Sequence, residues 1–276
     1  MRRAMAQNQL ELFCQPFANC STGAIEAAEA LIRWRHPTRG LLPPGDWVPA
    51  VESGRLSTSF NLHVMGLAIG HRARWLDAGV ELPLSVNVTP ACLSDARFLA
   101  GVDTLFAGQS PEGEIRLEVT EQATVTSGLA IDDSVERLRR NGFEFLCDDF
   151  GAEYSSLSRL ATLPFSTLKI DGSLVEGMTR TRAHRSIVHA SISLAHTLGL
   201  KAVAERVESP STWKLLQALG CDQLQGYLIA EPMPAQDFPA WLDAYEPDAP
   251  RALRRRDDRR SGDRRAGGDR RSSLRS

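Results

Sequence analysis

The sequence predicts an α/β fold, specifically a (β/α)8 barrel. Short apolar or β-branched segments alternate with longer segments of helical spacing from residue 8 to residue 245, about eight times, without an intervening linker. Such alternation is typical of parallel strands joined by crossover helices. The length of 276 residues also suits one barrel, for which about 250 residues is usual. We therefore expect one folded domain, residues 1–250, and a tail, residues 251–276.

The expected strands are eight short segments rich in apolar and β-branched residues. They span residues 10–17, 24–34, 84–89, 115–120, 143–150, 166–171, 201–205 and 223–227. Runs of this length and composition, bounded by polar or glycine-containing segments, indicate buried strands.

The connection between the first two strands is unusually short. Little more than NCSTG separates them, whereas a crossover helix needs about a dozen residues or more. Strands joined so closely form an antiparallel hairpin. We therefore expect the first strand of the barrel to run antiparallel to the second.

Helical spacing is clearest in residues 183–198. One stripe of this segment consists of Ile187, Ser191, Leu194 and Leu198. Gly199 follows at the position where a helix commonly ends in a left-handed residue, and Gly142 and Gly220 end two further helical segments in the same way. We expect helices before all three glycines.

Charge is distributed unevenly along the chain. Residues 251–276 carry eleven Arg and four Asp, a balance of +7, so residues 1–250 carry −9 of the total of −2. The tail has no apolar periodicity and cannot bury enough surface to fold, so we predict that it is disordered. It could contact an acidic partner, a nucleic acid or a membrane surface, although a solvated extension without a ligand is the simpler interpretation.

Cysteine usage and hydropathy indicate a cytoplasmic protein. The five cysteines are odd in number and form no CxxC pair, which argues against a disulfide framework or a zinc knuckle and for a reducing compartment. No apolar run approaches the ~20 residues of a membrane span, and the first residues lack the apolar core of a signal peptide.

Polar residues stand at the ends of the expected strands. In a barrel of this kind the carboxyl ends of the strands form the functional face. The residues at these ends are Glu29, Asn87, Glu118, Asp148, Asp149, Lys169, Asp171, Glu205 and Gln225. So many carboxylates at one mouth repel one another unless a cation neutralises them.

The donor types predict which cation that would be. Oxygen donors, without cysteine or a well-placed histidine, favour Mg²⁺ or Mn²⁺ over zinc. The adjacent Asp148 and Asp149 suggest a pair of ions, an arrangement used for phosphoryl hydrolysis. Lys169 would lie near the attacking water, and Arg33 could hold a phosphate oxygen. Residue chemistry alone thus predicts a metal-dependent barrel hydrolase of a phosphoester.

Residues 149–151 read Asp-Phe-Gly, a tripeptide that also occurs in protein kinases. The chain has no early Gly-rich loop, no HRD-type catalytic loop upstream and no APE downstream, so we reject a kinase. The histidines are spaced for neither a catalytic triad nor HExxH, and Cys147 has no evident histidine partner. We interpret the histidines as structural or surface residues and Cys147 as a small packed residue.

Eight strings carry a resemblance to a known family. They are QPF (15–17), EALIRWRHP (29–37), VNVT (86–89), LEVTE (117–121), DDFGAEYSSL (148–157), LKID (168–171), AERVE (204–208) and QGYL (225–228). In order and spacing they make the chain similar, over residues 3–245, to the EAL-domain cyclic di-GMP phosphodiesterases.

The resemblance implies an irregular TIM-like barrel with an antiparallel first strand. It implies hydrolysis of one phosphodiester of cyclic di-GMP to linear pGpG with two Mg²⁺ or Mn²⁺ ions per site, and a homodimer. The first residues read as a helix leading into the domain, which suggests an upstream sensory or GGDEF module.

The resemblance also implies residue roles. The metal ligands would be Glu29, Asn87, Glu118, Asp148, Asp149 and Glu205. The catalytic group would be Lys169, which positions the attacking water, with Asp149, Glu205 and Glu208. Substrate binding would fall to Gln15, Leu31, Arg33 and Gln225, and Glu121 would hold the loop after Asp149.

Two positions depart from the family pattern. Glu153 and Arg206 each stand where the family usually has glycine. A residue with a side chain is strained at positive φ, so each substitution implies strain or another loop path. The two side chains could also pair across the mouth.

Two functions therefore remain open. An active phosphodiesterase is favoured because every acidic ligand position carries the expected residue. A non-catalytic cyclic di-GMP receptor that signals through a partner is favoured by the altered loop at 150–157. An unrelated metal-dependent barrel would require eight coincidental strings, and we set it aside.

Overall fold

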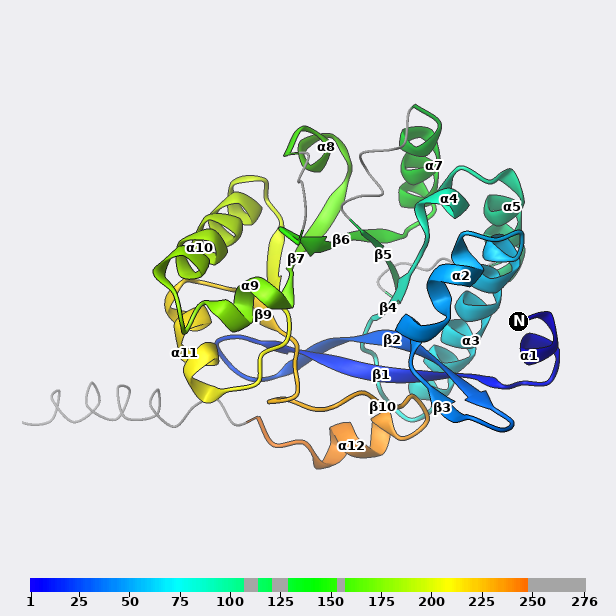
Figure 1. Cartoon of the computed structure of the whole chain (residues 1–276), viewed down its shortest axis with the longest axis horizontal. Helices are drawn as coiled ribbons and strands as arrows, with labels where there is room; N and C mark the ends of the chain where they lie inside the picture. The colour runs from blue at the N-terminus through cyan, green and yellow to red at the C-terminus, as the bar shows by residue number, and fades with distance from the viewer. Residues whose placement is uncertain (107–113, 121–128, 153–156, 248–276) are drawn as a thin grey trace, which may run out of the picture.

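The computed structural model describes residues 1–106, 114–120, 129–152 and 157–247 (Figure 1). The expected tail, residues 251–276, lies outside this part of the chain, as do Glu121 and Glu153. None of the helices in the described ranges is both long and apolar enough to cross a membrane.

All eight expected strands are confirmed. The strands are β1 (Leu10–Asn19), β2 (Ile25–His36), β3 (Gly40–Leu42), β4 (Leu84–Asn87), β5 (Ile115–Thr120), β6 (Glu144–Phe150), β7 (Phe165–Ile170), β8 (Lys201–Ala204), β9 (Gln223–Leu224) and β10 (Met233–Pro234). The short β3 and β10 were not expected; β3 pairs with the end of β2, and β10 pairs with Phe13 and Cys14 in the middle of β1.

The strands close into an eight-stranded barrel. Strands β2, β4, β5, β6, β7, β8 and β9 pair in that order, all in parallel. Strand β1 closes the ring by pairing antiparallel with both β2 and β9. The short connection after β1 therefore forms the predicted hairpin, and the antiparallel first strand is confirmed.

Helices surround the barrel (Figure 1). They are α1 (Arg2–Ala6), the 3-10 turn η1 (Pro44–Asp46), α2 (Val48–Glu52), α3 (Ser57–Asp77), α4 (Pro90–Leu93), α5 (Ala96–Leu105), α7 (Leu129–Arg140), α8 (Leu157–Thr162), α9 (Gly172–Gly177), α10 (Arg182–Thr197), α11 (Pro210–Ala218) and α12 (Phe238–Ala244). Gly142, Gly199 and Gly220 follow α7, α10 and α11 with φ of 97°, 75° and 79°, as predicted.

The buried face of α10 differs from the expected stripe. Its buried residues are Val188, Ser191, Ile192 and Ala195. Ser191 was predicted correctly, and Leu194 packs partly buried against the core. The prediction is wrong for Ile187 and Leu198, which are 46% and 36% exposed. The helix is rotated by about one residue from the expected orientation.

A small apolar cluster fills the barrel interior below the polar mouth. It consists of Phe17, Ala27, Leu146 and Val203, all at most 1% exposed. Each lies two residues along its strand from a polar residue of the mouth, and residues two apart on a strand share a face. The interior is therefore layered, and this cluster forms the floor of the site above it.

Candidate functional site

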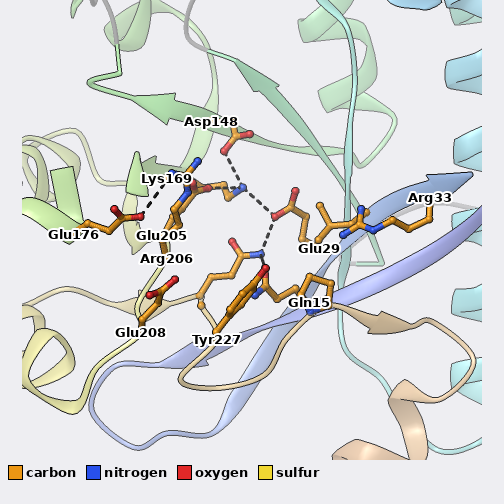
Figure 2. A pocket seen from close by; sticks show the side chains of 14 residues that line it. Gln15, Glu29, Arg33, Asp148, Lys169, Glu176, Glu205, Arg206, Glu208 and Tyr227 are labelled. Atoms are coloured by element: carbon orange, nitrogen blue, oxygen red, sulfur yellow. Dashed lines mark hydrogen bonds and ion pairs between the residues drawn. The ribbon is translucent and has the colours of Figure 1, made fainter. Parts of the chain in front are cut away.

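The polar residues expected at the strand ends gather around two adjoining cavities. The larger, of about 490 Å³, is lined by Gln15, Glu29, Leu31, Arg33, Asp148, Lys169, Glu205, Glu208 and Gln225 among others (Figure 2). The smaller, of about 280 Å³, adds Asn87, Glu118 and Asp149 and shares Leu31 and Asp148 with the first. Apart from Asp171, every predicted site residue that the structure describes thus lies at this mouth. Glu121 is outside the described residues.

Strand pairing places these residues at one level of the barrel. Gln15 on β1 is opposite Glu29 on β2, and Asn87 on β4 is opposite Glu118 on β5. Asp148 on β6 is opposite Thr120, the residue that ends β5. Because parallel neighbours end together, their last inward-facing side chains form one ring.

Lys169 lies at the centre of this ring. Its Nζ is 2.5 Å from Glu118, 2.8 Å from Asp148, 2.8 Å from Glu205 and 3.3 Å from Glu29. The side chain is 1% exposed, and the ammonium lies 5.8 Å from the centre of the Phe17 ring. A single ammonium thus contacts carboxylates from four different strands or strand ends.

The carboxylates and Lys169 shift each other's pKa values. Burial acts to lower the pKa of Lys169, but the surrounding carboxylates, Asp148 first, raise this pKa well above its ordinary value. Burial likewise acts to raise the pKa of Asp148, but the positive charge of Lys169 has the larger effect, so the pKa of Asp148 is lowered. Lys169 and Asp148 therefore form a charged pair inside the barrel.

One ammonium does not neutralise the remaining acids. Burial and then Glu29 raise the pKa of Glu118 well above its ordinary value. Burial, only partly opposed by Lys169, raises the pKa of Glu205 to about 8. Burial and the preceding aspartate raise the pKa of Asp149 as well. The group therefore holds more carboxylates than its own cation can keep ionised.

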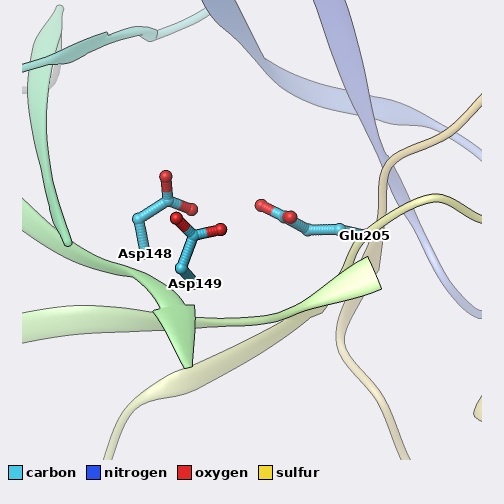
Figure 3. A group of neighbouring side chains, drawn as sticks. All are labelled: Asp148, Asp149 and Glu205. Atoms are coloured by element: carbon cyan, nitrogen blue, oxygen red, sulfur yellow. The ribbon is translucent and has the colours of Figure 1, made fainter. Parts of the chain in front are cut away.

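A local change of backbone direction lets two adjacent aspartates face the same cavity. Asp149 has φ of 56°, in the left-handed region, and the pairing of β6 with β7 shifts register between Cys147 and Phe150. The strict alternation of a strand is therefore interrupted. Ligand oxygens of Asp148, Asp149 and Glu205 come within 4.8 Å of one another, and Figure 3 shows the three carboxylates directed toward each other.

Amide side chains fix the orientation of Glu29. Asn87 Nδ2 donates to Glu29 Oε1 at 2.8 Å, and Gln225 Nε2 donates to Glu29 Oε2 at 2.8 Å. Gln225 also donates to Gln15 Oε1 at 3.2 Å, and Gln15 in turn donates to the carbonyl of Ala230 at 3.1 Å. Glu29 is thereby held with both oxygens bonded at the edge of the larger cavity.

The donor set fits hard divalent cations. Five carboxylates, those of Glu29, Glu118, Asp148, Asp149 and Glu205, gather around one ammonium, and Asn87 adds an amide oxygen. If all five are ionised, four negative charges remain uncompensated among the described side chains. Two divalent cations would balance them, and all-oxygen donors suit Mg²⁺ or Mn²⁺.

The cavity walls carry groups suited to a nucleotide. Arg33 is on β2, where its Nη1 donates to the carbonyl of Ile32 at 2.9 Å and its guanidinium lies 5.4 Å from the centre of the Phe13 ring. Burial lowers the pKa of Arg33. Tyr227 lines the same cavity and is 60% exposed, so its ring is free to stack on a base.

Some residues of the site were missed or misplaced from the sequence. Ser85, which hydrogen bonds to Glu118, lies two residues before Asn87, and the alternation of β4 could have indicated its inward position. Tyr227 and Glu176 also line the cavity and were not predicted. Asp171 was expected at the mouth, but it caps α9, where its carboxylate accepts from the amide of Ser173 at 3.0 Å.

A family model described as "EAL domain" matches residues 1–232. Among curated relatives, the cyclic di-GMP phosphodiesterase RocR of Pseudomonas aeruginosa is 32% identical over 237 residues, 86% of this chain. The bifunctional diguanylate cyclase/cyclic di-GMP phosphodiesterase MucR of the same organism is 35% identical over 240 residues, also 86% of this chain. The matched part makes up 60% of RocR and 35% of MucR, so this chain corresponds to a part of each.

A solved structure of a phosphodiesterase is similar to this chain as well. A structure described as "PaMucR Phosphodiesterase, c-di-GMP complex" has a TM-score of 0.81 and 34% identity, and the match covers 86% of this chain and 97% of that one. Structural similarity over nearly the whole of that chain supports the fold derived above from strand order and pairing.

Proposed function

The chain belongs to the EAL domain family, and from this premise we propose that it hydrolyses one of the two phosphodiester bonds of cyclic di-GMP to give linear pGpG. The observation that carries the proposal is the ring of five carboxylates around Lys169 at the mouth of the barrel. Relatives named as cyclic di-GMP phosphodiesterases support the choice of substrate.

The cofactor in this proposal is a pair of divalent cations, Mg²⁺ or Mn²⁺. Bound there, they would supply Lewis-acid chemistry, drawing charge from the phosphate oxygens and from the attacking water. The residues that would hold them are Glu29, Asn87, Glu118, Asp148, Asp149 and Glu205.

The remaining steps belong to the protein's own side chains. Water attacks the phosphorus, the bond from phosphorus to the 3′-oxygen breaks, and that oxygen takes up a proton. Lys169 orients the attacking water, because its ammonium is fixed by four carboxylates. Glu205 and Asp149, whose carboxylate oxygens lie close together, are placed to accept the proton that the attacking water releases.

Substrate binding in this proposal uses the walls of the larger cavity. Gln15, Leu31 and Arg33 come from β1 and β2, and Gln225 and Glu208 line the same cavity. Arg33 would bind a phosphate oxygen, and Gln225 and Glu208 would complete the polar network around Glu29. A homodimer and an upstream sensory or GGDEF module are the partners we propose, and size-exclusion chromatography with light scattering tests the first.

A second candidate function is a receptor that binds cyclic di-GMP without cleaving it. It is favoured by Arg206, which follows Glu205 directly and has φ of 51° where the family pattern has glycine. Strain beside a catalytic carboxylate could impair turnover while leaving the cavity intact.

A product assay separates the two functions. Purified protein is incubated with cyclic di-GMP and Mn²⁺, and pGpG is measured by chromatography, while calorimetry in Ca²⁺ measures binding. We expect pGpG to form. Binding without product at high protein concentration would establish the receptor and contradict the phosphodiesterase. The comparison with Glu153→Gly tests whether the loop limits the rate, since a large gain would show that it does.

A further inference from the structure

Arg206 brings a guanidinium into the larger cavity. The residue follows β8 directly after Glu205, its side chain is 61% exposed, and it lines the cavity. Figure 2 shows it on the opposite side of the cavity from Arg33. The mouth therefore has an arginine on each of two facing walls.

Arg206 has the positive φ that is usual for glycine, and its side chain packs against another glycine. Arg206 has φ of 51°, so the chain accepts strain rather than taking another route. Its stem lies against Gly172, the first residue of α9. A Cβ on Gly172 would lie 2.3 Å from Arg206 Cδ and 2.4 Å from Cγ, which is impossible without movement. Gly172 thus provides the space that directs Arg206 along this wall.

The guanidinium has unused hydrogen-bonding capacity. Among the described residues its one ion-pair partner is Glu176, at 3.7 Å, with both side chains largely exposed. A charge-assisted hydrogen bond is about 2.7–2.9 Å long, so this contact is loose. By contrast, the ammonium of Lys169 contacts four carboxylates and its side chain is 1% exposed, so it does not lie on the exposed wall of the cavity.

We propose that Arg206 binds the phosphodiester of cyclic di-GMP that is not cleaved. This assignment rests on the proposed function. A cyclic dinucleotide carries two phosphodiester anions, and the one that is cut must lie at the carboxylate ring. The second anion enters a cavity whose lining carries more carboxylates than cations, so it needs a cation on the wall. Arg206 supplies that cation beside Glu205, and its planar fork suits a phosphate.

Steady-state kinetics of Arg206→Gln with two substrates test the assignment. For cyclic di-GMP with Mn²⁺ we expect KM to rise about tenfold with little change in kcat, the size expected for loss of one charged contact at a partly exposed site. Bis(p-nitrophenyl) phosphate has a single phosphodiester, so its hydrolysis should not change. Arg206→Lys should recover part of the affinity, because lysine keeps the positive charge but lacks the planar fork.

A matched control and the contradicting outcomes complete the experiment. Arg182→Gln removes an exposed arginine outside the cavity lining and should leave both substrates unaffected. An unchanged KM in Arg206→Gln, an equal loss with both substrates, or no recovery in Arg206→Lys would each overturn the assignment. A wild type that neither binds nor cleaves cyclic di-GMP would refute the proposed function, and this assignment with it. A working wild type with an unaffected Arg206→Gln would refute this assignment alone.

Discussion

Replacing Lys169 by methionine should strongly destabilise the fold when no divalent cation is present. Lys169→Met keeps the length of the side chain and removes the charge. The ammonium is 1% exposed and contacts four carboxylates at 2.5–3.3 Å. Removing one partner of a buried ion pair costs about 3–5 kcal/mol, because it leaves charge buried without compensation. We expect the free energy of unfolding to fall by about 3 kcal/mol at pH 8, since some of the acids can take up protons.

The effect should depend on pH in a defined direction. The pKa of Lys169 is raised in the folded state. Its contribution to the free energy of unfolding is therefore fully present below the unfolded pKa and is lost as the pH rises through the folded pKa. The lowered pKa of Asp148 stabilises the fold above its unfolded value, and in the variant that stabilisation disappears. Protonation relieves the repulsion, so the difference between wild type and variant should shrink as the pH falls from 8 toward 5.

Urea unfolding in EDTA, followed by tryptophan fluorescence at both pH values, measures the difference. Lys201→Met serves as the control, because Lys201 is on the neighbouring strand β8 and is exposed. It should change the free energy of unfolding by at most about 0.5 kcal/mol. If Lys169→Met is as stable as Lys201→Met at pH 8, the ammonium does not hold the carboxylate ring together, and the reasoning is refuted.

Three further changes test other parts of the structure. Arg206→Gly should be about 1 kcal/mol more stable than Arg206→Ala in urea unfolding, because only glycine adopts φ of 51° without strain; equal stability would contradict this. Burial, with Arg74 adding to it, lowers the pKa of His71 to about 4. The urea midpoint of unfolding should therefore fall as the pH drops from about 6.5 toward 4. The midpoint of His71→Gln should not show this decline. Gln225→Leu should lower kcat about tenfold or more by freeing Glu29, measured as pGpG formation, and an unchanged rate would show that Glu29 needs no such support.

Much of the barrel could be predicted because strand and loop lengths constrain topology. The short connection after β1 admitted only an antiparallel hairpin, and the structure confirms it. Helix orientation was harder to predict. In α10, Ile187 is followed by Val188 and Leu194 by Ala195, so two adjacent stripes are both apolar. Periodicity alone could not decide between them, and packing against the barrel selects the second.

The candidate site could be located but not assembled from the sequence. Strand ends predicted that Glu29, Glu118 and Lys169 share a mouth, because parallel strands end together. That Lys169 contacts four carboxylates depends on side-chain packing across the barrel, which no local pattern encodes. The left-handed backbone of Asp149 likewise depends on the register shift between β6 and β7. The strain expected at Arg206 is confirmed by its φ, whereas its pairing with Glu153 stays a prediction.

The rate of pGpG formation by the wild type and by Glu29→Ala, in the same Mn²⁺ buffer, tests the central claim most directly. Glu29 contributes a carboxylate bonded by Asn87, Gln225 and Lys169, and it is 6% exposed. We predict steady conversion of cyclic di-GMP by the wild type, dependent on added Mn²⁺, and no detectable product from the variant. Equal rates in the two proteins, or no product from a wild type that binds the nucleotide, would contradict it.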